Sequence, residues 1–231
     1  MDQFSMPGKC DALKEPRGFV RIIQLLFAIF AFASTTSFYG HLNISDTCTN
    51  ITRIENKTFS YPFNLGSLGN LVPFCAPVKP LYGDFSSGAQ FYVFVGVIVF
   101  LYCIGTLLLY TLFVKNYESN VFFRKSDFGV SAVIVVLWFI ASVAWASGVD
   151  KLKRYTSESD IKLMINGSDH CVVDAPHGYA GLNISLLFGF SNVALWGAAL
   201  WFLWKETPWF SGEADALRQI NSIPEPDGST L

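Results

Sequence analysis

The stretch LNISLLFGFSNVALWGAALWFLW, residues 182–204, decides the fold. It is almost continuously apolar, carries one amide near its centre, Asn192, and contains no Asp, Glu, Lys or Arg. At a rise of about 1.5 Å per residue, a helix of this length crosses the hydrocarbon core of a bilayer, which is about 30 Å thick. Because lipid offers no hydrogen-bond partner to a bare backbone, the run is expected to be a transmembrane helix.

Three other stretches share this length and apolar character, so four spans are predicted, at about residues 19–39, 91–114, 128–149 and 181–204. The composition agrees, because only 15% of the 231 residues are charged, whereas about 25% are charged in an average soluble domain. The first span is not expected to be a cleaved signal peptide, since a segment with three acidic residues precedes it. The predicted fold class is an all-α membrane protein, a four-transmembrane-helix bundle.

An even number of spans places both termini on one side of the membrane. Lys and Arg divide nine to seven between the two sides, with the nine on the side of the termini, which only weakly favours a cytosolic location for that side. Glycosylation sequons are stronger evidence for this orientation. The four sequons outside the spans, at Asn43, Asn50, Asn56 and Asn166, all fall in the two loops on the side opposite the termini. We therefore expect cytosolic segments at 1–18 and 205–231, lumenal loops at 40–90 and 150–180, and glycosylation at these asparagines.

Three cysteines lie in the same two loops, Cys48 and Cys75 in the first and Cys171 in the second. In an oxidising compartment Cys48 and Cys75 are expected to pair, because closing their loop removes entropy from the unfolded chain. Cys171 is then either free or links two protomers, unless it displaces one of them in a bridge between the loops. The first loop also mixes β-branched, aromatic and turn residues, which predicts a small ordered ectodomain with short β-strands.

The sequence lacks the usual motifs of catalysis. We find no phosphate-binding glycine loop, no nucleophile elbow and no His-Glu-x-x-His, and DHCVVDAPH at 169–177 matches no common zinc spacing. An enzyme, a bound cofactor and a nucleic-acid partner are not expected. Arg21 and Asp127 are interpreted as span-end residues, one reaching toward water and the other capping a helix start.

Asn192 is the one strong amide interpreted as lying deep in a span. Gly189 and Gly197 lie beside it in a row of small residues with four-residue spacing. Small residues allow membrane helices to approach closely, and an amide can bond across their interface. These three residues are therefore predicted to pack the helices, with an interhelical hydrogen bond from Asn192. A role for Asn192 in lining a pore is the alternative.

Two short patterns predict binding sites near the chain ends. Arg17, Phe19 and Leu25 match the weak basic, aromatic and aliphatic pattern proposed for sterol contact. The last residues place Ser229 two positions before a terminal Leu231, the form that a PDZ domain accepts by strand addition.

Five collinear blocks carry a resemblance to a known family: KEPRGFVRIIQLLFAIFAFAS (14–34), YPFNL (61–65), GDFSSGAQFYV (83–93), LWFIASVAWASGVDKLK (137–153) and GLNISLLFGFSNVALWGAALWFLWKET (181–207). The chain resembles the synaptophysin family of vesicle proteins, members of the four-helix MARVEL group, and is most similar to its short-tailed, pantophysin-like relatives. The resemblance implies residence in transport or synaptic-like vesicles, cholesterol association, homo-oligomers and binding of synaptobrevin. It also implies two cysteines in the second lumenal loop, where this chain has Cys171 alone.

The expected function is that of a non-catalytic organiser of vesicle membranes. Its partners would be the lipid bilayer and cholesterol, further copies of the chain, a synaptobrevin-like fusion protein and a PDZ-domain protein. Two alternatives stay open, an oligomeric channel or solute pathway and a cell-junction or adhesion tetraspan. Conductance in a purified bilayer would favour the first, and residence at the cell surface would favour the second.

Overall fold

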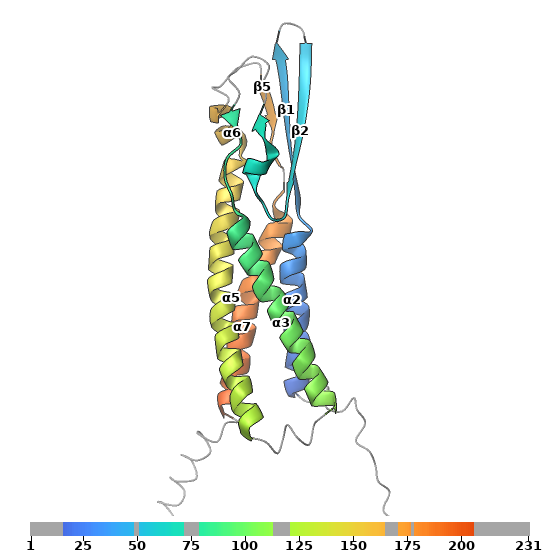
Figure 1. Ribbon diagram of the computed structural model, residues 1–231, viewed down its shortest axis with the longest axis vertical. Coiled ribbons are helices and arrows are strands. Elements are labelled where there is room, and N and C mark those ends of the chain that lie inside the picture. The colour runs from blue at the N-terminus through green and yellow to red at the C-terminus, as the bar shows by residue number, and fades with distance from the viewer. Residues whose placement is uncertain are drawn as a thin grey trace, which may run out of the picture.

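Four long helices form a bundle in the computed structural model, which describes residues 16–48, 51–71, 79–112, 121–164, 171–176 and 178–205 (Figure 1). The helices are α2 (Pro16–Thr36), α3 (Ser86–Leu112), α5 (Val121–Tyr155) and α7 (Ala180–Lys205). Each contains a segment long and apolar enough to cross a membrane, namely Gly18–Thr36, Ser86–Thr111, Lys125–Tyr155 and Ala180–Lys205. The predicted four-helix fold is confirmed.

The helix α3 crosses the bundle obliquely (Figure 1). Its first turns lie against α5, where a Cβ on Gly88 would stand 3.4 Å from the backbone oxygen of Ala144. Its middle lies against α2, where a Cβ on Gly96 would stand 3.1 Å from the Cβ of Phe32. Glycine at these positions lets α3 contact a different neighbour at each level of the bundle.

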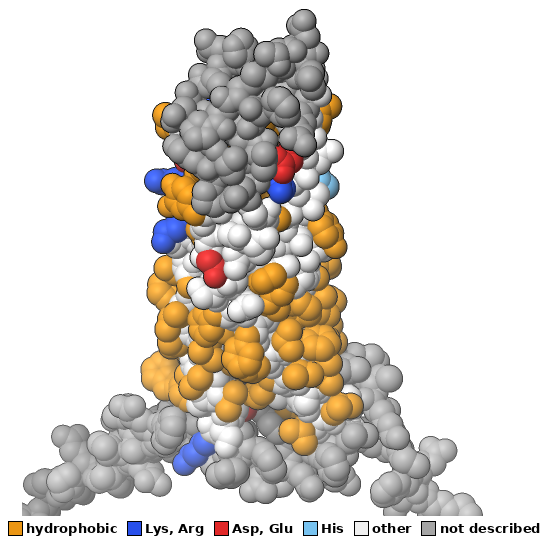
Figure 2. All heavy atoms as spheres, turned by 45° about the horizontal axis from the view of Figure 1, so that its top comes forward, with side chains coloured by type: hydrophobic (Ala, Val, Ile, Leu, Met, Phe, Trp, Pro, Cys, Tyr) orange, Lys and Arg blue, Asp and Glu red, His pale blue; other side chains and the backbone are white. Residues whose placement is uncertain are grey.

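Large aromatic side chains fill the centre of the bundle. Trp138 and Trp145 of α5, Trp196 of α7 and Tyr92 of α3 are all fully buried. The outward faces of the same helices expose large apolar side chains, among them Phe94, Leu101, Val133, Phe139 and Leu187. Figure 2 shows these apolar side chains gathered over the helices, with charged ones nearer the ends. Such a surface suits lipid, which is the solvent that four apolar spans require.

A three-stranded antiparallel sheet lies beyond one end of the bundle (Figure 1). It has the order β2-β1-β5 and consists of β1 (Tyr39–Cys48), β2 (Ile51–Ser60) and β5 (Cys171–Asp174). Ile44 of β1 faces Val173 of β5, and both are buried, as is Leu42 two residues earlier. This period of two, expected for a strand with one covered face, fixes the register of the sheet.

Four shorter elements complete the described part. They are the 3-10 helix η1 (Leu65–Leu68), the paired strands β3 (Asn70–Leu71) and β4 (Lys79–Pro80), and the helix α6 (Glu158–Met164). The predicted strands of the first loop are therefore confirmed. The strand in the second loop was not predicted, and its pairing with β1 joins the two loops into one sheet.

The helix ends differ from the predicted spans for local reasons. The first helix ends at Thr36 and not at 39, because Phe38 packs among the rings of Phe59, Phe63 and Tyr179 in the ectodomain. The third span was predicted to end at 149, but α5 continues to Tyr155. Leu152 is fully buried there, so the extension still has one side covered by protein.

Candidate functional site: a buried polar cluster inside the bundle

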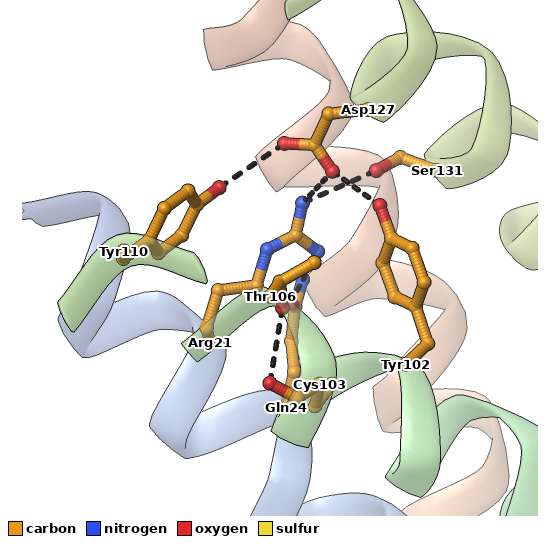
Figure 3. Close-up of polar contacts among 8 residues, drawn as sticks. All are labelled: Arg21, Gln24, Tyr102, Cys103, Thr106, Tyr110, Asp127 and Ser131. Carbon is orange, nitrogen blue, oxygen red and sulfur yellow. Dashed lines mark hydrogen bonds and ion pairs between the residues drawn. The ribbon is translucent and has the colours of Figure 1, made fainter. Parts of the chain in front are cut away.

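An ion pair lies inside the bundle between α2 and α5 (Figure 3). Nη2 of Arg21 is 2.6 Å from Oδ1 of Asp127, and the two side chains are only 4% and 5% exposed. The predicted roles of these two residues were therefore wrong, because Arg21 does not reach toward water and Asp127 does not cap the start of α5, which begins at Val121. Each lies near the end of a span, but both point inward, because each charge supplies the partner that the other needs away from water.

Tyrosines of α3 complete the coordination of the carboxylate. The hydroxyl of Tyr102 donates a hydrogen bond to Oδ1 of Asp127, and the hydroxyl of Tyr110 donates to Oδ2 at 3.2 Å. The guanidinium of Arg21 in turn donates to Oε1 of Gln24 at 2.9 Å and to Oγ of Ser131 at 3.4 Å. Figure 3 shows these side chains converging on one point from three helices.

The fourth helix joins the cluster through an aromatic ring. The guanidinium carbon of Arg21 lies 4.8 Å from the ring centroid of Trp196 on α7, and 5.5 Å from that of Tyr102. A cation over an aromatic face is attracted by the ring quadrupole, more strongly when water is excluded. The cluster therefore contacts all four helices, and its two charges cancel. Its chemistry is that of a structural tie between helices, since both charges and both tyrosine hydroxyls bond to neighbours in the protein.

A second set of buried polar contacts, the Tyr92–Ser185 group, lies closer to the sheet. Oγ of Ser185 on α7 accepts a hydrogen bond from Nε1 of Trp145 at 3.1 Å, and the backbone oxygen of Ser185 accepts one from the hydroxyl of Tyr92 at 2.5 Å. A Cβ on Gly189, one turn further along α7, would stand 2.6 Å from that hydroxyl and 2.8 Å from Oγ of Ser142. Only glycine fits at this position without displacing its neighbours.

The comparison with known families gives one match. The profile of a membrane-associating domain, MARVEL, matches residues 12–202. The chain belongs to the MARVEL family. The matched range contains the first three spans, both loops, every residue of the buried cluster and all of the fourth span except its last three residues.

Asn192 and Gly197 of the MARVEL domain do not act as predicted within this bundle. Asn192 is fully buried on the inner face of α7, but its Nδ2 donates to the backbone oxygen of Phe188 in the same helix, at 2.9 Å. The predicted interhelical hydrogen bond from Asn192 is therefore wrong for the described residues. Gly197 has no described atom within 4 Å of the place where its Cβ would stand, so it makes no close helix contact here, unlike Gly189.

The sequons differ in how their asparagines are placed. Asn43 and Asn56 are direct partners across β1 and β2, and Asn43 donates from Nδ2 to Oδ2 of Asp174 at 3.3 Å. Asn56 is exposed, whereas Asn50 and Asn166 lie outside the described residues. The further sequon at Asn183 has its serine, Ser185, fully buried.

The cysteines of the two loops are only partly located. Cys48 is the last residue of β1, and Cys171 is the first residue of β5. Cys171 pairs with Asp46 of β1, which precedes Cys48 by two residues. Cys75 lies outside the described residues, as do Ser229 and Leu231, so the disulfide pairing and the PDZ contact stay predictions. Within the described ranges, no group of three or more His, Cys, Asp or Glu residues lies together as a metal site would require.

Phe19 and Leu25 of the sterol pattern differ in their exposure. Phe19 is exposed on the outside of the bundle, whereas Leu25 packs against the core, and the side chain of Arg17 is outside the described part. A sterol contact at Phe19 stays a prediction.

Sequence reasoning missed Gln24, Tyr102 and Tyr110 as parts of a site. A usable signal existed for Gln24, because it lies three residues after Arg21 and so shares a helix face with it. No comparable local signal marks the tyrosines, which reach Asp127 from a different helix.

Proposed function

We propose that this MARVEL protein is a non-catalytic organiser of the membrane of transport or synaptic-like vesicles. Its resemblance to the synaptophysin family, and within it to pantophysin-like members, supports this role. Its oligomers gather cholesterol and a synaptobrevin-like fusion protein. The termini and the α3–α5 link face the cytosol, and the three-stranded sheet faces the vesicle lumen.

The filled interior of the bundle carries this proposal. Trp138, Trp145, Trp196 and Tyr92 occupy its centre, and the Arg21–Asp127 pair spans it from α2 to α5. We expect such a bundle to act by binding partners on its outer surfaces and not by conducting solutes through a single protomer. Its broad apolar outside can meet lipid, sterol and the helices of other proteins.

The ectodomain supports the same view. The long hairpin of β1 and β2 begins three residues after α2 ends, and β5 from the second loop pairs with it. The sheet is thereby connected to the bundle through both loops. A lumenal sheet that is connected to the bundle through both loops suits a protein that arranges partners at a vesicle membrane.

Isolation of native vesicles tests the partners. We would express the full chain with an N-terminal tag in secretory cells, capture vesicles and label them with a photoreactive cholesterol. The proposal expects sterol label on the chain and recovery of a synaptobrevin-like protein after solubilisation. Phe19→Ala should lower the sterol label, whereas Phe94→Ala, which alters a similarly exposed aromatic side chain on α3, serves as the matched control.

Two outcomes would contradict the proposal. Recovery of neither the sterol nor the fusion protein would remove the organising role. Ion conductance by the purified chain in a planar bilayer would favour the oligomeric channel instead.

A further inference from the structure

Five polar atoms inside the bundle have no hydrogen-bond partner within the described part of the chain. They are Nε2 of Gln24, Nε1 of Trp138, Oγ of Ser142, Oδ1 of Asn192 and Nε1 of Trp196. All five residues are fully buried. A buried polar atom without a partner costs roughly 1–3 kcal/mol, so five in one domain call for an explanation.

The five residues lie on the inner faces of α2, α5 and α7. Asn192 and Trp196 are one turn apart on the inner face of α7, and Trp138 and Ser142 are one turn apart on the inner face of α5. Gln24 touches the guanidinium of Arg21, which also lies against the ring of Trp196.

Near the sheet, the unpartnered residues approach the Tyr92–Ser185 group. Ser142 and the Tyr92 hydroxyl both lie beside Gly189, which is one turn before Asn192 on α7. The ring of Tyr92 is 5.6 Å from that of Trp138. On α7 the residues from Gly189 to Trp196 cover about 10 Å. The five residues therefore lead from the Arg21–Asp127 cluster, which Gln24 and Trp196 contact, to the Tyr92–Ser185 group, near which Ser142 and Trp138 lie.

The chemistry of the five atoms indicates what could satisfy them. Three are N–H donors from Gln24, Trp138 and Trp196, one is the acceptor of Asn192, and the Ser142 hydroxyl can do either. The surplus of donors requires a ligand with accepting oxygen atoms that can also donate to Asn192. Water meets both conditions, and buried water typically makes about three bonds to such groups.

We propose that a small cluster of internal water molecules is bound at the middle of the bundle by Gln24, Trp138, Ser142, Asn192 and Trp196. These waters join the Arg21–Asp127 cluster to the Tyr92–Ser185 group, so that one hydrogen-bonded column runs through the membrane interior. The column is a bound structural element and not a pathway, because the ion pair lies at one end of it and the Trp145–Ser185 hydrogen bond at the other. Asn192 is then an anchor for water and not a bond between helices.

The three buried tryptophans provide a test within one protein. Trp138, Trp145 and Trp196 are all fully buried, but only the indole of Trp145 has a protein partner. We would place the full chain, labelled with ¹⁵N in its indoles, in nanodiscs of deuterated lipid, and assign signals from single Trp→Phe variants. Cross-relaxation between water and each indole proton would then be measured.

The expected result is a signal from long-lived water at Trp138 and Trp196 and none at Trp145. In Asn192→Leu the signal at Trp138 should be lost, whereas Gly197→Ala, at an open position of the same helix, should leave all signals unchanged. Indoles of Trp138 and Trp196 as dry as that of Trp145 would overturn the proposal, as would an unchanged water signal in Asn192→Leu. If Asn192→Leu fails to fold, the water signals of the three indoles in the wild-type chain are sufficient to test the proposal.

Discussion

Arg21 and Asp127 illustrate how a charge pair can hold membrane helices together. Moving either charge from water into an apolar interior costs several kcal/mol, and the pair repays this only with good geometry and further hydrogen bonds. Here the 2.6 Å contact is supplemented by Tyr102 and Tyr110 on the carboxylate and by Gln24 on the guanidinium. The pair therefore specifies which faces of α2, α3 and α5 meet.

Removing one charge should be far more harmful than removing both. Asp127→Asn or Arg21→Leu leaves one buried charge uncompensated, which is expected to lower the free energy of unfolding by about 3–5 kcal/mol. The double variant Arg21→Leu with Asp127→Leu should lose less than the sum of the single losses. Unfolding in mixed micelles across the full double-mutant cycle measures this coupling.

The exposed pair of Asp150 and Arg154 provides the control. These side chains are one helical turn apart on the surface, so Asp150→Asn should change stability by no more than about 0.5 kcal/mol. Additive losses in the Arg21–Asp127 cycle would show that the pair has no special role.

Gly189 and Gly197 should respond in opposite ways to the same substitution. Gly189→Ala places a methyl group 2.6 Å from the Tyr92 hydroxyl, and such overpacking costs about 1–3 kcal/mol. Gly197→Ala meets open space and should be neutral, or stabilising by about 0.5–1 kcal/mol through its better helix propensity. Thermal unfolding in detergent compares the two variants, and equal effects would contradict this account of α7.

At the scale of elements, the sequence predicts helices better than it predicts their contacts. Length and apolar content identify each span because lipid imposes one thickness and one type of secondary structure. The same pattern does not reveal how each helix is rotated about its axis. Nothing in the local sequence therefore indicated that the side chains of Arg21 and Asp127, 106 residues apart, both point into the bundle. Asn192 was correctly placed at depth, but its bond within α7 depends on side-chain packing that the pattern does not encode.

The sheet shows the same limit for strands. The hairpin of β1 and β2 has ten residues in each strand and was predictable in outline. The strand β5 has only four, Cys171–Asp174, which is too short for alternation to distinguish it from a loop. Its pairing with β1 arises because Val173 covers the apolar face that Ile44 and Leu42 present.

Neighbouring valines in β5 test this packing. Val173 is 4% exposed and Val172 is 64% exposed, so they lie on opposite faces of one strand. Val173→Asp would bury a charge without a partner and is expected to cost about 3–5 kcal/mol of ectodomain stability. Val172→Asp should cost no more than about 0.5 kcal/mol.

Limited proteolysis of the two loops that form the sheet, with the chain in nanodiscs, gives the readout for the two valines. Faster cleavage of Val173→Asp alone is the expected result. Equal protection of the two variants would indicate that β5 does not hold the second loop to the sheet.

For the whole molecule, the structure separates three regions along one axis (Figure 1). A sheet built from both loops lies at one end, and hydrophobic side chains gather over the helices on the face that Figure 2 shows. The ion-pair cluster lies in the half away from the sheet, where α2 begins and α7 ends. The MARVEL match covers the same body of the chain. Because the ion pair and the large aromatic side chains are buried inside the bundle, its outer surfaces are the parts of the described structure that can meet partners.

The location of the full chain in cells tests the proposed vesicle role most directly. The chain would carry an epitope tag at its N-terminus and be expressed in secretory cells, and antibody would be applied to intact isolated vesicles and to intact cells. The account predicts that the chain resides in small cytoplasmic vesicles and that the tag is accessible on the intact vesicle surface, without detergent. Residence mainly at the cell surface, or a tag protected inside sealed vesicles, would contradict it.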